Sequence, residues 1–287
     1  MDDVSTVNGV EDADASSTGK SGDAPAAPGS GPDALPARRA ALLADAQPYC
    51  LEHALALAGS DALRLHGLAA PVLGTDLLLV TAEGPPLAEL AAGLAGTLRA
   101  AGHRVETPPG TARRHQLAVH RGESSLDSLA GEPPLGIELR REPLRHPPTL
   151  PADAPVPVAA LDDVAALAVL TLCERALPAD LRALHALTDR RREGELLALA
   201  SAFDEDLGPR TLADRLESAA ALLSADGAEA VDTAGTGGTG STGSTGSTGG
   251  TVKWAESWAQ DLRLDLLETT ELADGLHDPY LDRSDDL

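Results

Sequence analysis

The stretch LAGSDALRLHGLAAPVLGTDLLLV, residues 57–80, places a Gly-Ser pair before a short helix and one aspartate before an apolar strand. Gly59 and Ser60 open the helix, predicted over residues 61–67, and Asp76 precedes the apolar run 77–80. Four consecutive apolar residues between turn signals favour a buried strand over a helix. Amides at a helix N-terminus bind phosphate oxygens, and carboxylates bind magnesium. The stretch therefore predicts an α/β core with a candidate nucleotide site.

The flanking segments extend this core into a mixed sheet. Apolar residues at helical spacing predict a helix over residues 40–58 that ends at Gly59, and a second helix from Leu87 that stops at Gly102. Residues 103–107, 115–121 and 135–141 alternate as strands do. The order α-β-α-β-β-β predicts a mixed sheet with helices on one side.

The remainder of the chain is predicted to be helical or unstructured. After the Pro-rich segment 147–158, amphipathic patterns over 161–176, 180–192, 193–203 and 211–223 predict a helical bundle. Apolar residues at 254, 258, 262 and 266 predict a last helix that packs back. The expected division is a disordered acidic tail 1–37, an α/β domain 38–150, a helical domain 151–231, a flexible Gly/Ser/Thr linker 232–251, and an acidic helix with its tail over 252–287.

Composition excludes several classes of function. The net charge of −23 lies mostly in the two termini and opposes long-range attraction to nucleic acid or anionic membranes, although Arg190, Arg191 and Arg192 form a small basic patch. Lysine occurs only at positions 20 and 253, which leaves the central region without a lysine for a Schiff base or a phosphate-binding loop. Aromatic residues are too few for a base-stacking platform, and the histidines form no hydrolase motif.

The two cysteines and the apolar runs indicate the cellular compartment in which we expect the protein. No signal peptide precedes Cys50 and Cys173, so we expect reduced thiols and a cytoplasmic protein. Charges interrupt every apolar run before the ~20 residues that a bilayer requires, so no membrane segment is expected.

The order of these segments resembles a known family. LAGSDALRLHGL, GTDLLLVTA, AAGHRVE, IELRR, the Pro-rich crossing, the helix that begins LDDVAALAVL, and LLALASAFDEDLGP occur in the order seen in the AbiEii/AbiGii toxin family, within the polymerase-beta-like nucleotidyltransferase superfamily. The resemblance covers about residues 48–225. It implies an α+β fold, with a nucleotidyltransferase-like mixed sheet followed by a helical bundle half. It also implies magnesium-dependent transfer of a nucleotide from an NTP to a nucleic-acid acceptor, tRNA, and a small antitoxin protein as partner.

The resemblance assigns roles to four residues. Gly59 and Ser60 match the element that binds the triphosphate, and Asp76 and Glu138 match metal-binding, catalytic carboxylates. Two simpler interpretations stay open. Ser60 could serve only as a helix N-cap, and Glu138 could be a solvated strand residue. Arg64, His66 or the Arg190–Arg192 patch could contact phosphate.

Several positions depart from the family pattern. A second carboxylate is expected two residues from Asp76, but Leu78 stands there, and Gly74 stands at the alternative position. Ala168 replaces an expected lysine, and Ala179, Asp180 and Ala183 stand where an Arg-Asp pair and a further aspartate are usual. Asp162 and Asp163 match the pattern, but acids at a helix N-terminus also complement its dipole.

These departures leave two hypotheses. The first is a magnesium-dependent nucleotidyltransferase, and the second is a non-catalytic binding or regulatory protein on the same fold. A pair of magnesium ions brings four positive charges together, whereas Asp76 and Glu138 supply only two negative ones. We therefore expect a degenerate active site, that is, a pseudoenzyme.

Overall fold

The structure, a computed structural model, describes residues 35–69, 76–120, 133–234 and 244–275. Its first part runs α1 (Ala37–Glu52), β1 (Ala56–Ala58), α2 (Gly59–Leu65), β2 (Asp76–Thr81), α3 (Leu87–Ala100), β3 (Arg104–Glu106), β4 (Arg114–His120) and β5 (Leu135–Arg141). Its second part contains α4 (Leu161–Arg175), α5 (Pro178–Ala186), a 3-10 turn (Leu187–Asp189), α6 (Glu193–Ser201), α7 (Pro209–Ala234) and α8 (Ser244–Gly275). The predicted α+β class, a mixed sheet followed by a helical half, is confirmed.

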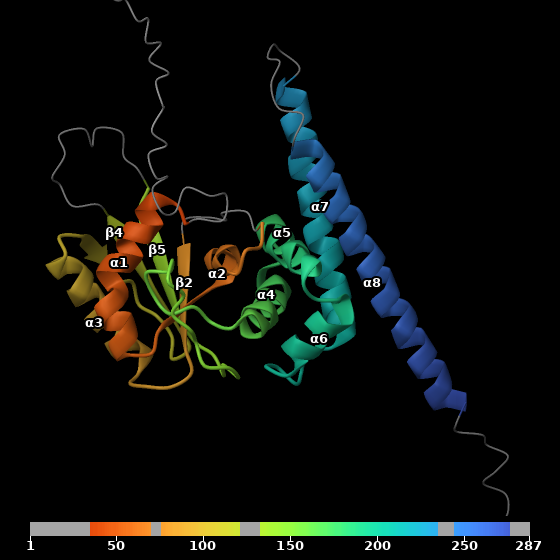
Figure 1. Cartoon of the computed structure of the whole chain (residues 1–287). Coiled ribbons are helices and arrows are strands. Elements are labelled where there is room, and N and C mark those ends of the chain that lie inside the picture. The colour runs from red at the N-terminus through yellow and green to blue at the C-terminus, as the bar shows by residue number, and fades with distance from the viewer. Residues whose placement is uncertain (1–34, 70–75, 121–132, 235–243, 276–287) are drawn as a thin grey trace, which may run out of the picture.

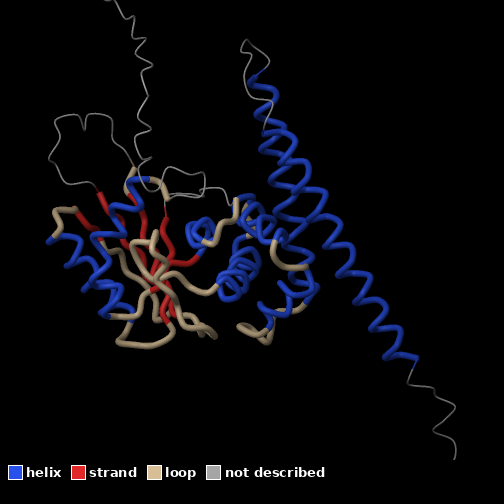
Figure 2. The backbone as a smooth tube through the Cα atoms, viewed as in Figure 1, coloured by secondary structure: helices blue, strands red, loops and turns tan. Residues whose placement is uncertain are grey.

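The five strands form one sheet in the order β1-β2-β5-β4-β3. β2 and β5 are parallel, and the other neighbours are antiparallel. α3 packs against β3, β4 and β5, and α1 packs against α3, whereas α2 and α4 lie on the opposite side of the sheet (Figure 1). Figure 2 shows the strands enclosed between the two groups of helices. The prediction of helices on one side only was wrong, because α2 packs on the opposite face of the sheet and the helical half packs against α2.

The predicted helix 40–58 is in fact a helix followed by a strand. α1 ends at Glu52, and Ala54 takes a left-handed backbone conformation with φ of 50°. The chain then extends into β1, which pairs with β2 and is buried along its whole length. Apolar residues at helical spacing misled the prediction, because a short strand buried on both faces shows no alternation of its own.

The last helix lies against α7, as its apolar stripe predicts. Ala255, Trp258, Ala259 and Leu262 are buried, and the Trp254 indole N–H donates to Glu193 Oε1 at 2.9 Å. α8 begins at Ser244 and α7 continues to Ala234, so the expected linker 232–251 is helical at both ends, and its centre lies outside the described residues. Most of the predicted acidic N-terminal tail also lies outside them.

Among the described residues, none of the helices combines the length and the apolar character that crossing a bilayer requires. Cys50 and Cys173 are free thiols. Burial raises the pKa of Cys50 to about 12 and that of Cys173 to about 11, so both thiols are uncharged at neutral pH.

Candidate functional site

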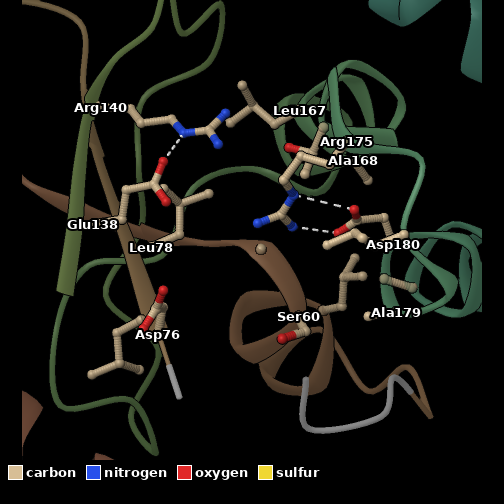
Figure 3. Close-up of a pocket in the computed structure, with 16 residues that line it drawn as sticks. Ser60, Asp76, Leu78, Glu138, Arg140, Leu167, Ala168, Arg175, Ala179 and Asp180 are labelled. Atoms are coloured by element: carbon tan, nitrogen blue, oxygen red, sulfur yellow. Dashed lines mark hydrogen bonds and ion pairs between the residues drawn. The ribbon is translucent and has the colours of Figure 1, made fainter. Parts of the chain in front are cut away.

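The candidate site lies on the face of the sheet that meets α4 and α5 (Figure 3). At its edge, β1 turns directly into α2 through Gly59, which has a φ of +68°, a conformation that glycine adopts without strain. A Cβ atom at Gly59 would lie 3.5 Å from Leu78 Cβ, so this turn packs closely on β2. Ser60 follows within α2 and lines the site. Ser60 is not the N-cap, because Ala58 holds that position and α2 has no side-chain cap.

The register of β2 with β5 places the carboxylates of Asp76 and Glu138 on the same face of the sheet, but not directly opposite each other. Asp76 of β2 is level with Gly136 of β5, and Leu78 is level with Glu138. Asp76 lies over the glycine so closely that a Cβ atom at Gly136 would be 1.9 Å from Asp76 Oδ1. From strand spacing and rise, the Cα atoms of Asp76 and Glu138 are separated by roughly 8 Å. Leu78 therefore occupies the position on β2 that directly faces Glu138.

The Glu138 carboxylate is bound by arginines. It turns away from Asp76 toward Arg140, whose Nε donates to Glu138 Oε1 (Figure 3). Arg114 of β4 binds both oxygens, through Nε to Oε1 at 2.9 Å and through Nη2 to Oε2 at 2.9 Å. Glu138 is buried, so it is not the solvated strand residue of the simpler interpretation. Two guanidinium groups thus provide the positive charge that a metal ion would provide.

Arg140 also connects the sheet to the helical half. Its Nη1 lies 3.3 Å from Glu174 Oε2 on α4. Burial lowers the pKa of Arg140, but the hydrogen bond and charge of Glu138 and the charge of Glu174 raise it above its ordinary value. The guanidinium therefore stays charged although only 5% of the residue is exposed.

A second ion pair, between Arg175 and Asp180 of the helical half, lines the cavity together with Glu138 and Arg140. Ala176 takes a left-handed conformation between α4 and α5, and the turn brings Arg175 back onto Asp180. Two of the three guanidinium nitrogens of Arg175 donate to it, with Nε 3.2 Å from Asp180 Oδ2 and Nη2 bonded to Oδ1 (Figure 3). Ala168, Ala179 and Ala183, which stand where the resemblance implies charged residues, line the same cavity.

These residues do not fit a magnesium pair. Among the described residues, there is no group of three or more His, Cys, Asp or Glu side chains that could hold a metal ion. Both oxygens of Glu138 already accept hydrogen bonds from guanidinium groups, and Leu78 offers no oxygen. The donor set for two-metal phosphoryl transfer is therefore missing from the described chain.

Asp162, Asp163, Arg191 and His66, which were also candidate residues, have structural partners. Asp163 is buried and accepts from the His146 backbone N–H at 3.0 Å, and Asp162 accepts from Arg191 Nε at 3.0 Å. These two acids hold neighbouring segments as well as complementing the dipole of α4. His66 Nε2 lies 2.9 Å from the carbonyl oxygen of Ala159.

The arginines of the site were not among the residues predicted from the sequence. Period-2 alternation places Arg140 on the same face as Glu138, so this neighbour could have been found. Arg114 is 24 positions away and becomes a neighbour only through the pairing of β4 with β5. Similarly, the Arg175 to Asp180 pair depends on a left-handed turn at an alanine, which the sequence does not signal.

Comparison with known proteins finds similarity to solved structures and to no family model or curated sequence. No protein-family model matches the chain, and no curated protein matches it by sequence. The crystal structure of JHP933 from Helicobacter pylori is similar at 15% identity, with a TM-score of 0.45, over 83% of this chain and 96% of that one. A putative nucleotidyltransferase from H. pylori is similar at 16% identity, with a TM-score of 0.43, over 80% and 95%. MenT4, a nucleotidyltransferase toxin from Mycobacterium tuberculosis H37Rv, is similar at 19% identity, with a TM-score of 0.44, over 77% and 84%.

Proposed function

We propose that this chain is a nucleotidyltransferase-type protein, of the AbiEii/AbiGii kind that its segment order resembles, with a centre that no longer transfers nucleotides. The chain then acts as a non-catalytic binding protein on that fold. The observation that carries the proposal is the pairing of Glu138 with Arg114 and Arg140, opposite Leu78. An acid engaged in this way cannot also neutralise a metal pair.

Electrostatic magnitudes support the loss of catalysis. Metal ions supply several kcal/mol of charge stabilisation to a phosphoryl-transfer transition state, and each ~1.4 kcal/mol corresponds to about tenfold in rate. Rebuilding the metal pair would require breaking the Glu138 contacts with two arginines and adding a carboxylate at position 78. The tRNA acceptor and the antitoxin partner implied by the resemblance remain predictions for the ancestral activity.

Incorporation of labelled nucleotides into RNA tests the proposal. We expect no incorporation from any of the four NTPs with magnesium, by the wild-type protein or by Asp76→Ala. The control variant is Glu89→Ala, which removes an exposed carboxylate on α3, remote from the cavity. Incorporation by the wild type and Glu89→Ala that disappears in Asp76→Ala would overturn the proposal and establish the enzyme hypothesis.

A further inference from the structure

The cavity between β2, β5, α4 and α5 is small. Its volume is about 200 Å³. A cavity of about 150 Å³ lined by apolar side chains binds benzene, whereas sites for drug-sized ligands measure roughly 300–1,000 Å³. The cavity therefore accommodates a compound of one or two rings, and is small for a nucleoside triphosphate.

The walls of the cavity are mostly apolar. Leu63, Leu77 and Leu167 line it and are at most 2% exposed. Leu78 and Ala168 add apolar surface where the family pattern has a carboxylate and a lysine. These substitutions remove charge from the two walls that face each other, and burial of an apolar ligand there is favourable in proportion to the area covered.

The charged groups of the cavity oppose an anionic ligand. Glu138 is bonded to Arg140, and Asp180 is bonded to Arg175, so these four charges compensate each other. Asp76 is a third carboxylate on the lining, and the two arginines of the lining are already bonded to Glu138 and Asp180. A triphosphate would add several negative charges to this site, without a metal site to offset them.

The lining also offers a few hydrogen-bonding groups. Ser60 of α2 and Thr171 of α4 are half-buried, and their hydroxyl groups can donate or accept. A mostly apolar pocket with a few polar groups that fix orientation is the usual composition of a small-molecule site.

From size, lining and charge together, we propose that this cavity binds an uncharged, mostly apolar compound of one or two rings, without phosphate and without a metal ion. The inference rests on the proposed function, because it names the ligand class that the altered centre accepts. Leu78 and Ala168 are then specificity-determining residues.

Ligand-observed NMR with indole as the probe tests this inference on the full chain. We expect saturable indole binding with a dissociation constant on the order of 1 mM or tighter, given the small size of the ligand. ATP, with or without magnesium, should bind at least tenfold more weakly than indole. Ala168→Phe, which fills the cavity, should weaken indole binding at least tenfold, whereas Ala92→Phe, at an exposed position on α3, should leave it unchanged.

Leu78→Asp provides a second variant in case Ala168→Phe does not fold, as judged by thermal unfolding. Its added carboxylate should also weaken indole binding at least tenfold. Absence of indole binding, or equal binding by the wild type and a folded cavity variant, would overturn the inference and leave the proposed function standing. Magnesium-dependent ATP binding tighter than that of indole would overturn both.

Discussion

Replacing Glu138 by leucine should destabilise the fold, because the buried Arg140 would lose its principal partner. Removing one member of a buried ion pair costs about 3–5 kcal/mol. Only 6% of the Arg140 side chain is exposed, whereas Glu174, its remaining partner, is 53% exposed and stabilises it weakly. The contact with Arg114 adds little to the cost, since that side chain is 42% exposed and can be hydrated. We therefore expect a loss of about 3 kcal/mol, at the low end of that range.

The double variant Glu138→Leu, Arg140→Leu separates this cause from simple disruption of the strand. Replacing a whole buried pair by apolar residues is often neutral, so the double variant should regain most of the lost stability. Urea unfolding followed by circular dichroism measures both free energies of unfolding. A loss below about 1 kcal/mol in the single variant, or a double variant no more stable than the single one, would refute the ion-pair argument.

Three further outcomes follow from the structure. Burial raises the pKa of Cys173 to about 11, from 9.0 for an ordinary thiol. Iodoacetamide should therefore alkylate Cys173 at pH 8 roughly 100-fold more slowly in the native protein than in urea, as followed by mass spectrometry. Equal rates would contradict the burial of the thiol. Gly59→Ala should lower the free energy of unfolding by about 1–2 kcal/mol because of its positive φ, whereas Gly96→Ala, in the open surface of α3, should raise it by up to about 1 kcal/mol. Asp61 forms a buried ion pair with Arg39, but burial raises the pKa of Asp61 by more than Arg39 and Arg64 lower it, so the folded state holds its proton more tightly than the unfolded state. The free energy of unfolding of the wild type, relative to Asp61→Asn, should therefore fall as pH rises above 3.8, and a rise in that difference would contradict the shift.

Local patterns predicted most of the fold. The apolar run before Gly84, the leucine stripe of α3 and the amphipathic helices of the second half were recognisable, because burial on one face imposes a period on the sequence. β1 was not recognisable, since a three-residue strand buried on both faces has no period. The second helical layer was also missed, because the face of the sheet on which α2 packs, and with it the helical half, depends on tertiary contacts.

The candidate site could be predicted only in part. Gly59, Ser60, Asp76 and Glu138 do lie on the lining of one cavity, and the lack of a carboxylate at position 78 was visible in the sequence. The partners of Glu138 decide its chemistry, and Arg114 is brought to it by strand register. Register depends on the whole sheet, so the difference between a metal ligand and an arginine-bound carboxylate was not contained in the local motif.

The most direct test of the account is a calorimetric titration of the full chain with magnesium and then with ATP in the presence of magnesium. With Glu138 bound by arginines and Leu78 in the facing position, we expect no saturable heat from magnesium and no effect of magnesium on ATP binding. Micromolar, magnesium-dependent ATP binding that is lost in Asp76→Ala would contradict the account.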